Sequence, residues 1–379
     1  MKRGDGILLQ SNVTRSPQRL SQRIQRILVV RTDRLGDVIL TLPVLPLLRE
    51  CFPEARISML LRRYTGEIAS GNPNVDSLIW YEDDKGIIPF RTMLSILIDE
   101  RPTVALVVHP TLRIALLMFL AGIPIRVGTG YRYFSFLFNR RVYEHRKDAL
   151  RHELEYNINL LAILGCTAGL RGKPPDFGIR HTEEDMNAVV ETLALMGIDP
   201  SKKRVILHPG SGGSAREWPV EYFEELAGEL SARGDLQVLV TGSEGEAERV
   251  ARIARAAGSG GLNLAGKFTI RQLVPLIKGG SLFISNSTGP LHIAAAVGTP
   301  VLGFYPQLTP MSPRRWGPYS NRSIVLVPAA PMDCKKCRRG KNPPCACMAS
   351  ITVQEALDAS VALLGGTESE WKREMRHVS

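Results

Sequence analysis

Long apolar runs are missing from this sequence. The longest candidate, Ile114 to Ile125, covers about 12 residues, whereas a helix that spans a bilayer needs roughly 20. The first 23 residues carry several basic side chains, but the apolar stretch Ile7 to Leu9 is too short for the core of a secretory signal. We therefore expect a disordered basic tail at residues 1–24 of a cytoplasmic protein.

Several motifs are also missing. No Gly-x-Gly-x-x-Gly follows the first strand candidate, Ile27 to Arg31, which disfavours an NAD-dependent oxidoreductase. No Asp-x-Asp pair follows a strand, so we expect no hard metal ion in catalysis. The compact signatures of nucleic-acid-binding folds are absent, and we expect no nucleic-acid partner.

Positive charge is in excess, because 48 Lys and Arg residues stand against 37 Asp and Glu residues, a formal net charge of +11. Residues 126–147 are dense in arginine and aromatic residues, and Glu144 is their only acid. This pattern favours a basic face for an anionic acceptor at a membrane surface. A generally basic surface without a partner is the alternative.

Short apolar runs alternate with helix-like segments, which predicts parallel sheets covered by helices. The expected strands are Ile27–Arg31, Arg56–Leu61, Ser77–Trp80, Val104–His109, Ile125–Gly128, Val205–His208, Leu236–Thr241, Leu282–Ser285 and Pro300–Phe304. Glycine and proline density marks a linker at 166–182 between an acceptor-binding domain, 25–165, and a nucleotide-binding domain, 183–350. We expect two Rossmann-like α/β domains that face each other across a cleft. The segment 351–379 should form a C-terminal helix that crosses back to the first domain.

Three turns carry candidate chemistry. In the first half, Arg31-Thr32-Asp33-Arg34-Leu35-Gly36-Asp37 joins a buried strand to an apolar helix, and Asp37 is either a functional carboxylate or the cap of a helix that begins near Val38. In the second half, the glycine- and serine-rich loop 207–219 could turn its backbone N–H groups toward a phosphate. The turn 284–292 opens a helix at Thr288 and Gly289, which could bind a phosphate or simply cap that helix.

Together these motifs resemble glycosyltransferase family 9, the lipopolysaccharide heptosyltransferase family. The resemblance covers roughly residues 26–327 and rests on Leu-Gly-Asp followed by Thr-Leu-Pro, on His-Pro-Gly-Ser-Gly with Arg-x-Trp-Pro, and on Asn-Ser-Thr-Gly-Pro-Leu-His. It implies the two-domain GT-B fold and inverting transfer of a sugar, most often heptose from ADP-heptose, to a lipopolysaccharide core acceptor. Asp37 matches the general base of the family.

The resemblance also implies the other site residues. The donor-binding candidates are Ser211, Gly212, Gly213, Arg216, Glu246, Lys267, Phe268, Thr288 and Gly289. Glu248 competes with Glu246 as the ribose-binding carboxylate. Ser287 stands where several members carry Asp, and Arg216 replaces the Lys of some members. Apart from the resemblance, we take the basic residues Arg62, Arg63, Arg126 and Arg132 of the first half as acceptor-binding candidates.

We expect no metal in catalysis, because the glycine loop, Arg216 and the Thr288 helix end could stabilise a departing diphosphate.

The remaining titratable residues are expected to have no role in catalysis. His208 and His292 should be structural, and Glu153 should either orient a loop or, as we favour, be solvated. The sequence places four cysteines close together, and they could either bind a structural metal or form a loop of reduced thiols. These residues are Cys334, Cys337, Cys345 and Cys347. Cys51 and Cys166 are expected to be plain packing residues.

Two other functions stay open at this point. A sugar-nucleotide epimerase of the same fold would keep the nucleotide-binding half but would need no acceptor. A non-catalytic sugar-nucleotide-binding protein would keep the donor site without turnover.

Overall fold

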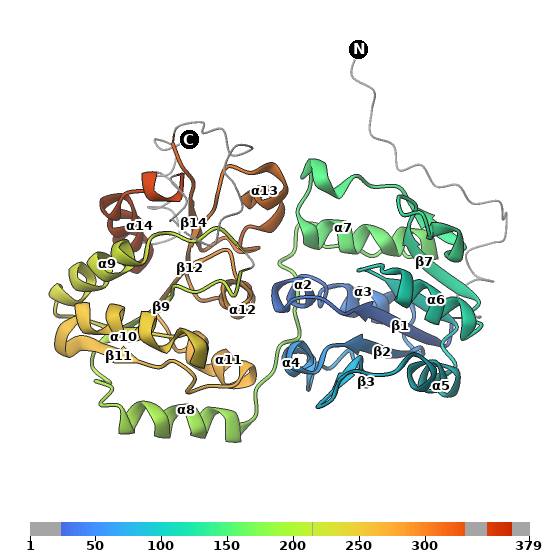
Figure 1. Ribbon diagram of the computed structural model, residues 1–379, viewed down its shortest axis with the longest axis horizontal. Coiled ribbons are helices and arrows are strands. Elements are labelled where there is room, and N and C mark those ends of the chain that lie inside the picture. The colour runs from blue at the N-terminus through green and yellow to red at the C-terminus, as the bar shows by residue number, and fades with distance from the viewer. Residues whose placement is uncertain (1–23, 214, 330–346, 366–379) are drawn as a thin grey trace, which may run out of the picture. The chain divides into compact units, whose positions relative to one another are not determined.

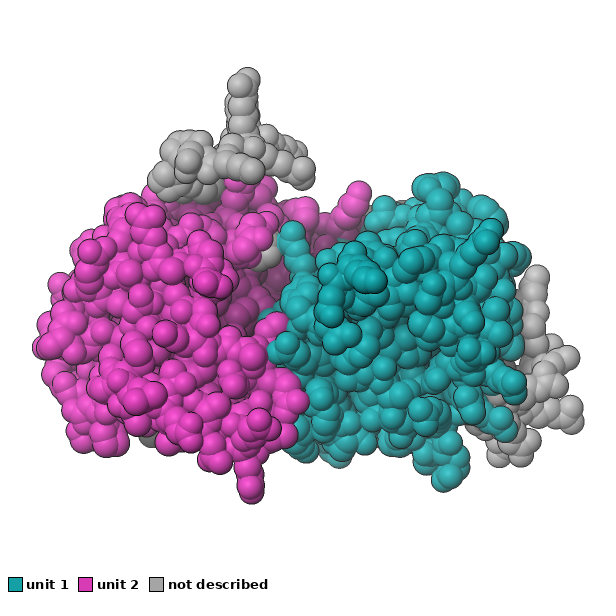
Figure 2. Space-filling view, turned by 60° about the horizontal axis from the view of Figure 1, so that its bottom comes forward, with its two compact units in different colours: residues 1–146, 151–180 teal, residues 147–150, 181–379 magenta. Residues whose placement is uncertain are grey.

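The structure is a computed structural model, and it describes residues 24–213, 215–329 and 347–365. The chain divides into two compact units, shown in different colours in Figure 2. Unit 1 comprises Met1–Arg146 with Arg151–Arg180, and unit 2 comprises Lys147–Leu150 with His181–Ser379. Each unit contains a six-stranded parallel sheet. The predicted α/β fold with two Rossmann-like domains is therefore confirmed.

The sheet of unit 1 has the strand order β3-β2-β1-β6-β7-β8 (Figure 1). Its strands are β1 (Arg26–Arg31), β2 (Arg56–Leu61), β3 (Ser77–Trp80), β6 (Val104–Val107), β7 (Ile125–Thr129) and β8 (Arg140–Val142). In β1, Ile27 pairs with Ile57 on one side and with Val104 on the other. The strand is buried on both sides, as its continuous apolar run predicts.

Helices and short turns complete unit 1. The helices are α2 (Leu35–Ile39), α3 (Val44–Cys51), α4 (Arg63–Gly66), α5 (Phe90–Glu100), α6 (Leu112–Leu120) and α7 (Glu153–Asn159). The 3₁₀ turns are η1 (Glu67–Ala69), η2 (Ser135–Leu137), η3 (Arg146–Asp148) and η4 (Leu160–Leu164), and β4 (Glu82–Asp83) with β5 (Gly86–Ile87) forms a hairpin. The core of the unit lies between the sheet and helices such as α5 and α6.

The sheet of unit 2 has the order β11-β10-β9-β12-β13-β14, which repeats the order of unit 1. Its strands are β9 (Lys203–His208), β10 (Leu236–Val240), β11 (Gly261–Asn263), β12 (Leu282–Asn286), β13 (Val301–Phe304) and β14 (Ser323–Leu326). Counted along the chain within each unit, both sheets read 3-2-1-4-5-6, the order of dinucleotide-binding Rossmann folds.

Helices cover both faces of this second sheet. They are α8 (Glu183–Leu195), α9 (Val220–Ala232), α10 (Ala247–Ala256), α11 (Ile270–Lys278), α12 (Gly289–Val297), α13 (Pro313–Trp316) and α14 (Val353–Gly365), with the 3₁₀ turns η5 (Glu244–Glu246), η6 (Gly258–Gly260), η7 (Thr309–Met311) and η8 (Met348–Ser350). Helix α14 packs against α9, β13 and β14. The buried Trp218 ring stacks on Phe304 with 4.3 Å between centroids, and this pair anchors the core.

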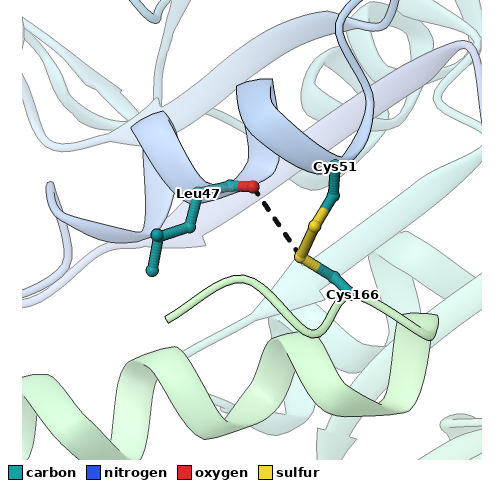
Figure 3. Close-up of a disulfide and its surroundings, with 3 residues drawn as sticks. All are labelled: Leu47, Cys51 and Cys166. Carbon is teal, nitrogen blue, oxygen red and sulfur yellow. Dashed lines mark hydrogen bonds between the residues drawn. A yellow bond between two sulfur atoms is a disulfide. The ribbon is translucent and has the colours of Figure 1, made fainter. Parts of the chain in front are cut away.

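A disulfide crosslinks unit 1 (Figure 3). It joins Cys51, the last residue of α3, to Cys166, which follows η4, across a sequence separation of 115. The sulfur of Cys166 also lies 3.7 Å from the carbonyl oxygen of Leu47. The expectation that both cysteines are plain packing residues is wrong, because the fold brings the end of α3 against the segment that leaves η4.

Within the described ranges, no helix combines the length and the apolar character that crossing a bilayer would require.

Candidate active site

Each sheet has one topological switch point, where the strand order reverses beside the first strand. It lies between β1 and β6 in unit 1 and between β9 and β12 in unit 2. Ligands of open α/β sheets bind outside the carboxyl ends of the strands at such points. The predicted turns 31–37, 207–219 and 284–292 all leave these strands, so the topology places them where ligands are expected.

Asp37 lies inside the first turn of α2. Figure 1 shows α2 at the end of β1. The cap position of α2 is held by Arg34, whose side chain makes no capping hydrogen bond. The alternative that Asp37 caps the helix is therefore wrong. Its carboxylate instead accepts a hydrogen bond from the guanidinium of Arg31, at the end of β1.

Arg31 is the centre of a buried charge cluster. Its side chain is only 3% exposed, and it pairs with Asp33 through Nε at 2.8 Å, with Asp37, and with Glu153 through Nη1 at 3.6 Å. Burial disfavours the charged guanidinium, but the three carboxylates together hold the pKa of Arg31 above its ordinary value.

Burial raises the pKa of Asp37 to about 6. Arg31 opposes this rise, and the negative charges of Asp33 and Glu153 add to it. A carboxylate with such a pKa is mostly ionised at pH 7 and is a stronger base than an ordinary aspartate. Asp37 therefore has the protonation behaviour that a general base needs.

Glu153 contacts both Arg31 and a second arginine, Arg146. Its side chain is 2% exposed, and Oε1 accepts a hydrogen bond from Arg146 Nη1 at 2.6 Å. The expectation that Glu153 is solvated is wrong. His152 and Glu155 close a capping box at the start of α7, which turns Glu153 inward between the two arginines.

Asn157, on the same helix as Glu153, forms hydrogen bonds with the segment that follows Asp37. The Asn157 amide donates to the backbone oxygen of Leu40 at 3.0 Å and to the hydroxyl oxygen of Thr41 at 3.2 Å. The Thr41 hydroxyl in turn donates to the backbone oxygen of Asp37 at 2.8 Å. Helices α2 and α7 are thus held together next to the charge cluster.

Two of the acceptor candidates lie near this switch point. The Nε of Arg62 donates to the backbone oxygen of Thr32 at 2.9 Å. His109, which follows β6, has Nδ1 3.8 Å from Asp33 Oδ2. Its pKa is lowered first by burial, and the positive charges of Arg132 and Arg62 act in the same direction. Both arginines are therefore close enough to His109 to act on its charge.

The other two acceptor candidates make contacts of a different kind. The Arg63 guanidinium lies over the ring of Trp80 at 5.8 Å. Arg126 lies over the ring of Phe119 at 5.3 Å, and its Nε donates to the backbone oxygen of Leu137 at 2.8 Å. These contacts hold the side chains on neighbouring elements, and the structure does not place them with His109.

In unit 2, the loop after β9 is held in place by a glutamate. The N–H and hydroxyl of Ser211 donate to Glu217 Oε1 at 2.9 and 2.7 Å, and Arg249 pairs with the other oxygen of Glu217 at 3.0 Å. Gly212 and Gly213 follow with φ angles of +55° and +75°, which L side chains rarely adopt. Their backbone is exposed, and other residues could not replace these glycines without strain.

Arg216 is half-buried in the same loop. Among the described residues, its guanidinium takes part in no ion pair and donates no hydrogen bond. A cation without a protein partner is suited to bind an anionic ligand.

The loop after β12 is tied to the loop after β9. The Asn286 amide nitrogen donates to the backbone oxygen of Pro209 at 2.7 Å, while its oxygen accepts from the Trp218 N–H at 2.8 Å. Thr288 occupies the cap position of α12, yet its side chain makes no capping hydrogen bond and contacts the Ser285 hydroxyl at 3.0 Å instead. The helix N-terminus at Gly289 therefore keeps its positive end for a ligand.

Glu246 meets the glycine loop from η5. A Cβ at Gly210 would lie 1.6 Å from Glu246 Oε1, so only glycine fits there beside the carboxylate. Burial favours the neutral acid, but hydrogen bonds from the hydroxyl and N–H of Ser243 lower the pKa of Glu246 below its ordinary value. Glu248 is exposed on α10. Of the two carboxylates, Glu246 is the one that contacts the loop.

Lys267 and Phe268 lie in the loop that follows β11. A hydrogen bond of 2.9 Å from the Gly266 N–H to the Gly242 oxygen joins this loop to the one after β10. Lys267 is exposed and Phe268 is half-buried. The fold thus gathers the predicted donor candidates on loops at the carboxyl edge of one sheet.

The two histidines have structural surroundings. The Nδ1 of His208 lies 3.0 Å from the hydroxyl of Thr241, and burial lowers the pKa of His208 to about 4, against the effect of Glu246. His208 is therefore neutral at pH 7. His292 is buried within α12.

Within the described ranges, no group of three or more His, Cys, Asp or Glu side chains is placed to hold a metal ion. Cys347 is buried in the core of unit 2, whereas Cys334, Cys337 and Cys345 lie outside the described residues.

Residue patterns alone missed the partners of the candidate residues. Arg31 was noted only as the first residue of a motif. Nothing in the sequence distinguished Glu153, Arg146 and Glu217 from the many other charged residues. The one available signal was position, since Arg31 ends a buried strand and cannot reach bulk water there.

The comparisons with known proteins agree with this description. The family model described as glycosyltransferase family 9 (heptosyltransferase) matches residues 96–344. The lipopolysaccharide core heptosyltransferase OpsX of Haemophilus influenzae is 25% identical over 304 residues, which cover 79% of this chain and 83% of that protein. The match to the family model begins after the turn that contains Asp37.

Two solved structures share the fold. The glycosyl transferase family 9 protein from Veillonella parvula matches with a TM-score of 0.78 at 24% identity, over 90% of this chain and 97% of that one. The E. coli ADP-heptose lipopolysaccharide heptosyltransferase II matches with a TM-score of 0.71 at 24% identity, over 90% of this chain and 98% of that one. At these identities the two structures establish the two-domain GT-B architecture.

Proposed function

The chain belongs to glycosyltransferase family 9 and is a glycosyltransferase, and from this premise we propose that it transfers heptose from ADP-heptose to a lipopolysaccharide core or related anionic glycolipid. The names of its relatives support the donor and the acceptor, since one is a core heptosyltransferase and another is an ADP-heptose enzyme. We further propose that the enzyme works in the cytoplasm, at the inner face of the inner membrane.

Asp37 is the general base of this proposal, and its environment is the observation that carries it. A pKa of about 6 allows Asp37 to be ionised at pH 7 and to accept the proton of the acceptor hydroxyl. The hydroxyl oxygen then bonds to the anomeric carbon of the donor sugar, while the bond from that carbon to the diphosphate breaks. The electron pair leaves with ADP, and the configuration at the sugar carbon is inverted.

Unit 2 supplies the donor site. The diphosphate would bind the N-terminus of α12 at Thr288 and Gly289, the backbone of Gly212 and Gly213, and the guanidinium of Arg216. On binding, the Ser211 hydroxyl would turn from Glu217 to a phosphate oxygen. Glu246 would accept hydrogen bonds from the ribose, with Lys267 and Phe268 beside the base.

Unit 1 supplies the acceptor site. Arg62, which donates to the backbone oxygen of Thr32, and Arg132, whose charge acts on His109, would supply positive charge for an anionic sugar or phosphate of the acceptor. Arg63 and Arg126 are further acceptor candidates because of their positive charge, and their stacking contacts would have to loosen for that role.

The experiment is a transfer assay with a heptose-deficient lipopolysaccharide core acceptor. ADP-heptose, UDP-glucose and GDP-mannose are compared as donors, and the glycolipid product is identified by mass. We expect a gain of one heptose from ADP-heptose only, also in the presence of a chelator, since the cationic groups above replace a metal. Transfer only from a UDP- or GDP-sugar, or activity that a chelator removes and Mg²⁺ restores, would contradict the proposal.

A further inference from the structure

The loop before β8 divides its aromatic side chains between the core and the surface. Phe134 and Leu137 are buried, with 5% and 4% exposure, whereas Tyr133 and Phe136 are 80% and 70% exposed. The buried pair packs into the core of unit 1 together with α6. The two exposed rings therefore sit on an anchored turn and project outward from it.

The C-terminal end of α6 adds apolar surface to this turn. Phe119 and Leu120 are 47% and 52% exposed. The Arg126 guanidinium covers the Phe119 ring at 5.3 Å and donates to the backbone oxygen of Leu137, the neighbour of Phe136. Arg126 thus joins the end of α6 to the turn that carries Tyr133 and Phe136.

The charge along this segment of the chain has one sign. From Arg101 to Tyr143 the sequence contains no Asp or Glu. Within the part of the chain that the structure describes, no ion pair involves the arginines of this stretch, which are Arg101, Arg113, Arg126, Arg132, Arg140 and Arg141. The exposed rings therefore belong to a segment whose arginines pair with no carboxylate among the described residues.

We propose that this part of unit 1 docks on an anionic phospholipid bilayer. The docking surface, here called the aromatic–arginine surface, consists of Phe119, Leu120, Arg126, Tyr133, Phe136 and Arg140. Aromatic rings favour the headgroup level of a membrane, and arginines are attracted to anionic lipids. Apolar contact and charge attraction are the two signals that stable surface binding needs together.

This inference deepens the proposed function, because a glycolipid acceptor is presented at a membrane. It can nevertheless be tested without donor or acceptor, so that its failure is distinct from a failure of the proposed transfer reaction.

The test is sedimentation of the full-length chain with vesicles of phosphatidylcholine, with and without phosphatidylglycerol. We expect binding to the anionic vesicles that weakens with added salt. The double variant Y133S/F136S should lower the partition coefficient at least about tenfold, because it removes the exposed rings. R140Q should lower it about fivefold on anionic vesicles only.

Control variants come from exposed positions on other elements. Val190 and Leu195 on α8 are 56% and 89% exposed, so V190S/L195S removes comparable apolar surface from unit 2. Arg91 is an exposed arginine on α5, and R91Q is the control for R140Q. Neither control should change vesicle binding. Circular dichroism and thermal unfolding confirm that each variant is folded.

Three outcomes would overturn the proposal. The first is a wild-type chain that does not bind anionic vesicles, and the second is a Y133S/F136S variant that binds as well as the wild type. The third is a wild-type dimer in light scattering that Y133S/F136S dissociates while vesicle binding is unchanged. In that case the surface is an interface between copies of the chain.

Discussion

Units 1 and 2 share one strand order but present different chemical groups at their switch points. After β1, charge is carried by buried side chains, with Arg31 held among three carboxylates. After β9 and β12, positive potential comes from glycine-rich backbone, the end of α12 and Arg216. Buried, coupled carboxylates suit proton transfer, whereas backbone N–H groups suit an anion that arrives and leaves. One scaffold thus supports either task through its loops.

The comparison predicts that Asp37→Asn removes catalysis. Asparagine keeps the shape of the side chain but cannot accept a proton, so kcat should fall by about 10²- to 10⁴-fold. The control is D99N, an exposed aspartate on α5 of the same unit, which should keep the wild-type rate. A D37N enzyme within a few-fold of the wild-type kcat would exclude Asp37 as the base.

The disulfide should make the stability of unit 1 depend on redox conditions. It closes a loop with a sequence separation of 115, and loss of a native disulfide commonly costs about 2–4 kcal/mol of unfolding free energy. Adding reductant, or the double variant C51S/C166S, should therefore lower the free energy of unfolding of unit 1. In hydrogen exchange, the slowest-exchanging peptides of unit 1 should then exchange faster, while peptides of unit 2 change little. Alkylation of Cys51 and Cys166 without reductant would show that the bond is not formed.

Arg216→Gln tests the anion site of unit 2. Loss of a charged hydrogen-bond donor to the diphosphate should raise the donor KM by about 10- to 100-fold. The pH dependence of kcat should stay at its wild-type position, because unit 1 is untouched. R233Q, at the exposed end of α9, is the matched control and should leave the donor KM unchanged. An R216Q defect confined to kcat would contradict the assignment.

The smallest effect concerns pH. If Asp37 is the base, as we propose, it must be ionised to act, so activity should fall as the pH drops below about 6. The negative charge of Glu153 helps to raise the pKa of Asp37, so E153Q should move this acid limb to lower pH, by up to about one unit. E50Q, at an exposed glutamate on α3 of the same unit, should leave the limb in place. An upward shift in E153Q would contradict the described cluster.

The sequence predicted the buried centre of each sheet better than its edges. β1 and β9 are continuous apolar runs, and their bounds match the expected strands within two residues. β8, β11 and β14 were missed because they are edge strands of three or four residues with few buried side chains. A short edge strand forms mainly because it pairs with its neighbouring strand, and its own hydrophobic pattern is too short to predict it.

The candidate site shows the same limit. Asp37 and the glycine loops were found because turn residues follow apolar strands in a recognisable order. The contacts of Glu153 with Arg31, and of Cys51 with Cys166, were not predictable, because each joins residues more than a hundred positions apart. Such pairings depend on how α3 and α7 pack, and no local pattern encodes that packing.

The division of labour between the units is tested most directly by calorimetric titration of ADP into the wild type, D37N and R216Q. The account predicts that D37N binds ADP with the wild-type Kd, within about twofold, while R216Q binds at least about tenfold more weakly. The opposite pattern, with weakened binding in D37N and unchanged binding in R216Q, would contradict the assignment of proton transfer to unit 1 and of donor binding to unit 2.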